Sequence, residues 1–377
     1  MKKVIITDLL ILAVFGSTCF WSVKKDRLTA SVDKMLTEQT SEDEEILVLT
    51  SSNLAKKNGQ IGETQMSENA DKASEENTTK DYIKWVDFTV SKFALTESYE
   101  YDRDTYGTDR HISWIDLLAW TAAHTGGKFG DDRTVCKCME ELEMETEAGK
   151  KLEELTEDLE YFPYYREVYE TVLGGMVGEY EIEEPDAQGR KVTQKRYGLK
   201  AFHPIAKGFP YTDYDDFGAS RSYGYRREHL GHDMMGQVGT PVVCVESGYV
   251  EALGWNQYGG WRIGIRSFDK KRYYYYAHLR QGFPYQPELK EGSVVLAGDV
   301  IGYMGHTGYS TKEDVNNIDQ THLHVGMQLI FDESQKDSDN EIWIDCYQIM
   351  GFLYRNQSET ARNDETKEWS RKYQMSD

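Results

Sequence analysis

Short apolar runs separated by glycine-rich turns fill residues 199–333 and restrict the folds open to this part of the chain. Val242–Val245 and Tyr249–Leu253 are expected strands, and Trp261–Arg266 alternates in character as a strand does. Tyr273–Leu279 is the expected return partner of that strand. Closely spaced glycines suit a tightly turned antiparallel sheet, and five follow: Gly292, Gly298, Gly302, Gly305 and Gly308. We therefore expect an all-β antiparallel domain here.

Two pairs of metal-binding residue types lie within this segment. His229 and Asp233 form an H-x-x-x-D pair, and His322 and His324 form an H-x-H pair later in the chain, with His278 between them. Side chains alternate along a strand, so both histidines of H-x-H would face one side of it. Imidazole and carboxylate groups are zinc ligands, and a catalytic zinc site uses three protein ligands and leaves one position open. Patterns as short as either pair occur by chance in many sequences, so the surrounding motifs decide the interpretation.

Several short motifs follow one another between the two pairs. They are, in order, Gly239–Val243, Glu246–Val250, Tyr276–Leu279, Gly292–Val295, Ala297–Gly302 and Gly305–Ser310. Together with the flanking pairs they resemble the lysostaphin-type zinc metallopeptidases, which cut peptide cross-bridges and stems of bacterial peptidoglycan. The resemblance covers residues 199–333, about a third of the chain.

The resemblance implies a role for each residue of the two pairs and for His278. His229, Asp233 and His324 would bind one zinc ion (Zn2+) per chain. His278 and His322 would lie beside it, orienting or deprotonating the attacking water and stabilising the oxyanion. Peptidoglycan peptides would be the substrate. The bond that is cut stays open, because glycine-bridge, stem-peptide and D-amino-acid cross-link specificities share these motifs.

Three other positions need separate interpretations. His232 is out of register with the family's ligand, so we predict that it does not bind the metal. Tyr258 shapes the substrate groove or is an exposed loop tyrosine, and the sequence leaves both open. The segment Thr311–Gln320 is longer and more acidic than the family's usual Gly-Pro link, so we expect it to border the cleft. Val325-Gly326 replaces the usual aromatic-acidic pair.

Two alternatives to the zinc metalloendopeptidase are kept. Some proteins with a similar architecture have lost ligands and act as assembly scaffolds. A cell-wall-binding module could instead use zinc only for structure, but such a site is closed by four ligands. Retention of all five residues favours the enzyme.

An apolar run from Val4 to Val23 is long enough to span a bilayer. We predict a signal anchor at residues 1–23 and a disordered linker at residues 24–79. The chain would then be a single-pass cell-membrane protein with its catalytic domain outside the cytoplasm. Cleavage of the segment would make it secreted instead.

Residues 80–198 have a helical pattern that ends in a predicted hairpin. Helices are expected at Ile112–Trp120, Cys138–Glu145, Ala148–Leu159 and Tyr164–Leu173. Residues 334–377 are expected to form a helix at Glu341–Arg355 and a disordered tail. The predicted whole is multidomain: an N-terminal membrane helix, a small α-helical region and an all-β antiparallel peptidase domain.

The formal net charge of −22 argues against a nucleic-acid partner, because phosphate binding needs a basic surface. Five cysteines make no disulfide framework. Cys136 and Cys138 are interpreted as ordinary side chains, because no second such pair exists. The oligomeric state is left open.

Overall fold

The computed structural model describes residues 88–223, 226–335 and 341–376. The predicted membrane anchor at residues 1–23 and the linker at residues 24–79 lie outside these ranges. Within the described ranges, no helix combines the length and the apolar composition that a membrane span needs.

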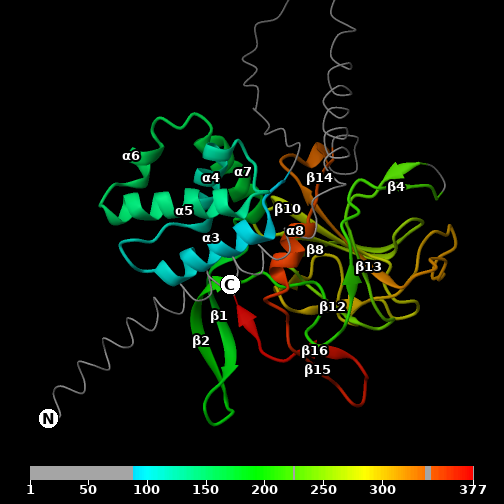
Figure 1. Cartoon of the computed structure of the whole chain (residues 1–377). Coiled ribbons are helices and arrows are strands. Elements are labelled where there is room, and N and C mark those ends of the chain that lie inside the picture. Colours follow the sequence, from blue (N-terminus) through cyan, green and yellow to red (C-terminus); the bar gives the residue numbers. More distant parts are fainter. Residues whose placement is uncertain (1–87, 224–225, 336–340, 377) are drawn as a thin grey trace, which may run out of the picture. The chain divides into compact units, whose positions relative to one another are not determined.

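Helices make up the first part of the described chain (Figure 1). Their bounds are α3 (Lys92–Thr105), α4 (Trp114–Thr125), α5 (Asp132–Glu147), α6 (Leu152–Thr156) and α7 (Phe162–Leu173). Helix α4 begins later than the pattern suggested, because the Ser113 side chain caps it by accepting a hydrogen bond from the Asp116 amide. It ends at Gly126, which has a left-handed φ of 64°. Helix α6 is shorter than the expected Ala148–Leu159, since Gly149 (φ 90°) interrupts that stretch.

The predicted hairpin forms from β1 (Val177–Pro185) and β2 (Lys191–Leu199), which pair antiparallel along their whole length. A third strand, β17 (Met375–Ser376), extends this sheet beside β1. The chain's last residues thus return to the hairpin.

The prediction of a disordered tail is wrong for the described residues. Strands β15 (Thr360–Arg362) and β16 (Trp369–Arg371) form a second small hairpin. A few buried anchors order this polar stretch: Ser358 donates to the Gly298 carbonyl at 2.6 Å, and Arg371 donates to the Ala297 carbonyl at 2.6 Å. The predicted helix at Glu341–Arg355 is also too long. Its first residues form β14 (Ile342–Ile344), which pairs with the sheet, and only α8 (Tyr347–Leu353) is helical.

An eight-stranded sheet forms the centre of the β-rich segment, with all strand pairs antiparallel. Its order is β11 (Val294–Val295), β8 (Gly248–Asn256), β9 (Gly260–Ser267), β10 (Arg272–Ala277), β13 (His322–Leu329), β6 (His232–Met235) and β3 (Thr212–Asp213), with β14 also pairing with β13. Two short antiparallel pairs accompany it: β7 (Pro241–Val243) with β12 (Val300–Tyr303), and β4 (Ser220–Arg221) with β5 (Arg227–Glu228). The expectation of an antiparallel β domain is confirmed.

A buried ion pair joins this sheet to the helices. Arg272 at the start of β10 is only 1% exposed and binds the Glu246 carboxylate through two contacts of 2.8 Å. It also donates to the Thr171 carbonyl in α7 at 2.6 Å. The backbone passes so close that a Cβ on Gly175 would lie 1.9 Å from Glu246 Oε1. Removing one partner of such a pair leaves an uncompensated buried charge and is strongly destabilising. The ion pair therefore stabilises the contact between the sheet and helix α7.

Candidate metal centre

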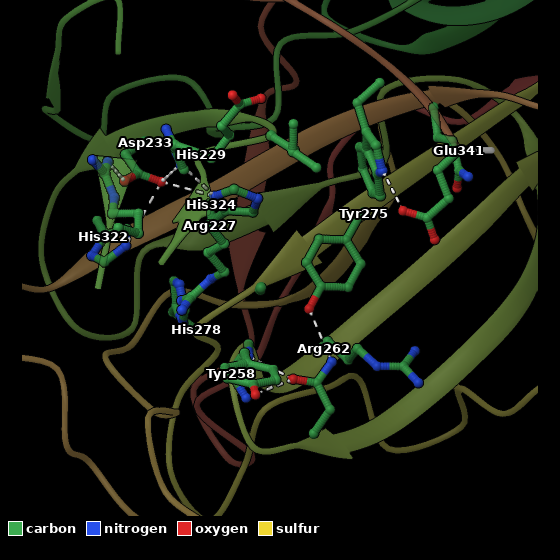
Figure 2. A pocket seen from close by; sticks show the side chains of 18 of the residues that line it. Arg227, His229, Asp233, Tyr258, Arg262, Tyr275, His278, His322, His324 and Glu341 are labelled. Carbon is green, nitrogen blue, oxygen red and sulfur yellow. Dashed lines mark hydrogen bonds and ion pairs between the residues drawn. The ribbon is translucent and has the colours of Figure 1, made fainter. Parts of the chain in front are cut away.

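Strand register brings three of the predicted residues together. Asp233 on β6 is directly opposite His324 on β13, and His229 lies just before β6. His229 Nε2, Asp233 Oδ1 and His324 Nδ1 form a triangle with sides of 2.9–3.0 Å (Figure 2). The structure thus brings together the three side chains that the sequence analysis named as metal ligands. Among the described residues, they are the group of His, Cys, Asp and Glu side chains close enough to share a metal ion.

The donor set and its spacing fit zinc. Ligand atoms about 2.0–2.1 Å from a tetrahedral zinc lie about 3.3–3.4 Å apart, slightly more than the sides of this triangle. Gly231 provides the necessary room, because a Cβ there would lie 2.5 Å from Cε1 of His324. Two histidine nitrogens and one carboxylate oxygen are also ligands that zinc prefers.

The outer nitrogen of His229 is held by Asp216, in the loop before β4. His229 Nδ1 lies 3.2 Å from the Asp216 carbonyl oxygen and 3.1 Å from its Oδ1. Both atoms are acceptors, so Nδ1 carries the proton and the Nε2 lone pair faces the centre. A carboxylate or carbonyl behind a ligating histidine is the usual arrangement at zinc sites.

Arg221 on β4 connects the carboxylates. Its Nη2 pairs with Asp216 and lies 3.2 Å from Asp233 Oδ2, which leaves Asp233 Oδ1 pointing into the triangle. Burial opposes ionisation of Asp233, but the contacts of its carboxylate with His229 and His324 outweigh burial and hold the pKa of Asp233 below its usual range. Asp233 is therefore a carboxylate at neutral pH, as metal binding requires.

His278 and His322 lie beside the triangle with their ring centroids 4.6 Å apart. Each bonds a backbone carbonyl through Nδ1: His278 to Thr307 at 3.0 Å and His322 to Gln320 at 2.9 Å. Their Nε2 atoms are thus left for chemistry, and His322 Nε2 lies 3.8 Å from Asp233 Oδ1. Burial, followed by the nearby His322 and His324 charges, lowers the pKa of His278, so its ring is neutral.

The backbone at His278 is unusual. Its φ of 61° lies in the left-handed region, which residues other than glycine rarely adopt. Two hydrogen bonds hold it there: the His278 amide donates to the Gly259 carbonyl at 2.7 Å, and its carbonyl accepts from the Gly305 amide at 3.0 Å. The sequence contains no signal for this strain.

The five residues stand at one end of a groove with a volume of about 560 Å³. We call it the substrate groove and define its floor as the sheet face that carries Tyr275, His324 and Gln328. Tyr258 lines the groove, and Glu341 lies at the end away from the histidines (Figure 2). Tyr309 and Trp343 are also lining residues, and Trp343 Nε1 donates to Glu341 at 2.7 Å. Tyr258 therefore lines the groove, which agrees with one of the two interpretations that the sequence left open.

Two other sequence predictions concern neighbours of the groove. His232 Nε2 contacts Asp213 Oδ2 at 2.9 Å and stands apart from the triangle, consistent with the prediction that it is no ligand. The segment Thr311–Gln320 reaches the groove indirectly, because Asn317 donates to the carbonyl of the lining residue Tyr309 at 2.6 Å.

Sequence reasoning missed Asp216, Arg227, Arg262 and Trp343 as residues of this site. The ion pairs of Arg221 likewise had no signal in the sequence.

Similarity to known proteins agrees with this geometry. Residues 227–338 match the model of Peptidase family M23, and they contain all five site residues. These residues form a peptidase family M23 domain. The resemblance noted in the sequence is thereby confirmed. Relatives of the M23 domain include the L-Ala–D-Glu endopeptidase of Bacillus subtilis, 42% identical over 33% of this chain and 36% of the relative. Lysostaphin of Staphylococcus simulans is 39% identical over 22% of this chain and 16% of the relative.

Among solved structures, the catalytic domain of lysostaphin from Staphylococcus simulans is 30% identical, with a TM-score of 0.29. The match covers 37% of this chain and 92% of that domain. The chain spans about a third or less of the two curated relatives, so the likeness concerns the M23 domain rather than the whole proteins.

Proposed function

We propose that this chain is a zinc metalloendopeptidase that hydrolyses peptide bonds of bacterial peptidoglycan. The observation that carries the proposal is the meeting of the three-residue triangle with His278 and His322 at one end of an open groove. The names of the M23 relatives, L-Ala–D-Glu endopeptidase and lysostaphin, agree with this reaction class.

The metal ligands would be His229, Asp233 and His324. The chemistry that zinc supplies when bound is a more acidic water and a polarised carbonyl. Asp216 and Arg221 would keep His229 and Asp233 in the correct tautomer and charge state. Their effect on the reaction is therefore indirect.

His278 and His322 would move the proton and stabilise charge. A neutral imidazole with Nδ1–H fixed on a carbonyl has a free Nε2 lone pair, which can accept a proton from water. Once protonated, Nε2 becomes a donor for a developing oxyanion or for the leaving amine. Two such rings with centroids 4.6 Å apart can divide these tasks.

This arrangement favours an enzyme over the two alternatives. A structural zinc site would be closed by a fourth ligand, whereas the group of described side chains close enough to share an ion has three members, and His278 and His322 stand outside it. A scaffold would have no need of the strained φ at His278, which costs about 1–3 kcal/mol.

We further propose a location outside the cytoplasm, with residues 1–23 as a single-pass anchor. The supports are the apolar run from Val4 to Val23 and the location of the proposed substrate. Peptidoglycan peptides would then be the partner that the groove meets.

The function is tested by incubating the purified full chain with peptidoglycan and identifying the released muropeptides by mass spectrometry. We expect release that stops after metal removal and returns with zinc. Elemental analysis should give about one zinc per chain. A zinc-loaded protein that releases nothing from several wall types would favour the scaffold interpretation.

A further inference from the structure

Two arginines of the substrate groove form no ion pair with the described residues. Arg227 on β5 and Arg262 on β9 both line the groove beyond the metal centre (Figure 2). Arg227 donates to the Tyr223 carbonyl at 2.8 Å, and its guanidinium lies 4.9 Å from the ring centroid of Tyr258 and 5.3 Å from that of Tyr309. The aromatic rings hold this cation beside the cavity.

Neither guanidinium pairs with a carboxylate of any described residue. Among the other charged residues of the groove, Arg221 binds Asp216 and Asp233, and Glu341 accepts from Trp343 Nε1 at 2.7 Å. Glu228 on β5 also lines the groove, and the two arginines remain its cations without an ion pair among the described residues.

Both arginines face the floor of the groove. Burial raises the pKa of the Tyr275 hydroxyl, and the Asn256 hydrogen bond, followed by the positive charges of Arg262 and Arg227, opposes that rise. Arg262 lies on the same sheet face as Gly264, the residue opposite Tyr275. The two cations therefore line the same groove as the histidines, near Tyr275.

We propose that Arg227 and Arg262 bind a carboxylate of the substrate, so that the groove selects an anionic stem-type peptide over a neutral glycine bridge. This proposal rests on the proposed function and specifies its substrate class. The carboxylate is either the free α-carboxylate of an internal γ-linked glutamate or the C-terminal one of the peptide.

Carboxylate recognition suits this geometry. A guanidinium presents paired N–H donors that match the two oxygens of a carboxylate. Both arginines are half-buried, so the contact would be less screened than at an open surface. Arg227 is also held in place by its carbonyl and aromatic contacts, which reduces the entropy lost on binding.

The test uses the full chain and four soluble peptides. One is the stem peptide L-Ala-γ-D-Glu-L-Lys-D-Ala, one has its internal carboxylate as an amide, one has its C-terminus as an amide, and one is pentaglycine. Hydrolysis is followed by kcat/KM. Binding is measured by calorimetry with the His278→Ala variant, so that affinity is obtained without turnover.

The variants are Arg227→Gln and Arg262→Gln, with Arg280→Gln as the matched control. Arg280 also bonds a carbonyl, that of Phe283 at 3.1 Å, and lies 4.3 Å from the ring centroid of Tyr303, but it is not among the groove residues. We expect each groove variant to weaken binding of the carboxylate peptide about ten- to a hundredfold. The amide peptide that lacks the recognised carboxylate should bind the protein with both groove arginines as weakly as the carboxylate peptide binds the groove variants. Arg227→Gln and Arg262→Gln should not weaken binding of that amide further.

The peptide arms identify which carboxylate is recognised. Equal affinity of the His278→Ala protein, with both groove arginines present, for the stem peptide and both amides, or a preference for pentaglycine, would overturn the proposal while leaving the endopeptidase intact. Absence of hydrolysis on all peptides and walls would reject the proposed function, yet the calorimetry would still decide whether the arginines bind a carboxylate. Loss of affinity in Arg280→Gln equal to that of the groove variants would also count against the assignment.

Discussion

At the scale of single residues, the five site side chains divide into two kinds. His229 and His324 present one nitrogen each to the Asp233 carboxylate, whereas His278 and His322 hold a carbonyl through Nδ1 and stand beside that triangle. Under the proposed function, this geometry would separate metal binding from proton transfer. Substitutions at the two kinds of position should have different consequences.

The first prediction concerns this separation. Replacing His229, Asp233 or His324 by Ala should remove zinc and activity together, because a ligand is lost. His278→Ala and His322→Ala should keep zinc while turnover falls by about a hundredfold or more. Zinc content by elemental analysis and the peptide-cleavage rate are measured for each variant.

His124→Ala is the control for this series. His124 also bonds a carbonyl through Nδ1, that of Trp120 at 2.8 Å, but lies in helix α4. It should leave zinc content and rate unchanged. Full activity in either His278→Ala or His322→Ala would contradict the catalytic assignment of that residue.

At the scale of elements, helix α5 contains a carboxyl group, that of Glu143, whose surroundings disfavour its ionised form. Burial, followed by the negative charges of Glu140, Glu147 and Glu97, raises the pKa of Glu143 to about 7. An unfolded-chain glutamate titrates near 4.5. The folded protein therefore holds this proton between pH 4.5 and 7, and gains stability relative to the unfolded chain as the pH falls through that window.

The second prediction follows from this sign. Glu143→Gln should stabilise the protein at pH 8, on the order of 1 kcal/mol after allowing for solvent screening, and have little effect at pH 5. Urea unfolding at both pH values measures the free energy of unfolding. The exposed Glu153 of α6 provides the control, and Glu153→Gln should show no such pH-dependent difference. A gain for Glu143→Gln that is equal at pH 5 and pH 8 would refute ionisation of the buried carboxyl group as its cause.

The third prediction concerns the Thr311–Gln320 segment, which we expect to affect turnover through Tyr309. Asn317 donates to the Tyr309 carbonyl at 2.6 Å, while its neighbour Asn316 donates to Gln281 Oε1 at 2.9 Å. Replacing the segment with a short Gly-Pro link, or Asn317→Ala alone, should change kcat/KM or substrate preference with zinc retained.

The neighbouring asparagine is the matched control for that experiment. Asn316→Ala removes a side-chain hydrogen bond of the same kind but leaves Tyr309 held, so its kinetics should resemble wild type. Unchanged kinetics of the shortened chain on every wall tested would remove any role of the segment in the reaction.

Some elements of this site could be predicted from the sequence because their geometry is local. Side chains two residues apart on a strand point to the same face, so His322 and His324 could be placed together. Short apolar runs between glycines likewise predict the antiparallel sheet. The contacts of Asp216 and Arg221 depend on how a loop folds over β6, which no periodicity encodes. The ordered tail was missed for a similar reason, because a few buried anchors such as Ser358 and Arg371 organise a polar stretch.

At the scale of the whole molecule, charge and location have to be reconciled. A chain with a formal net charge of −22 is repelled at long range by an anionic cell wall, so binding must come from local contacts. The groove arginines are one source of such contacts. Tethering at the membrane would be another, because it keeps the domain near its substrate without long-range attraction.

The fourth prediction is the topology that this tethering requires. The apolar run Val4–Val23 should hold the chain in the membrane with everything after it outside, since the proposed substrate lies there. Protease added to intact protoplasts should therefore degrade the M23 domain, while a cytoplasmic marker protein stays intact until detergent is added. Deleting residues 1–23 should remove the chain from the membrane fraction. Full protection of the M23 domain in intact protoplasts would place it inside the cell and exclude this topology, because an enzyme there could not reach the wall.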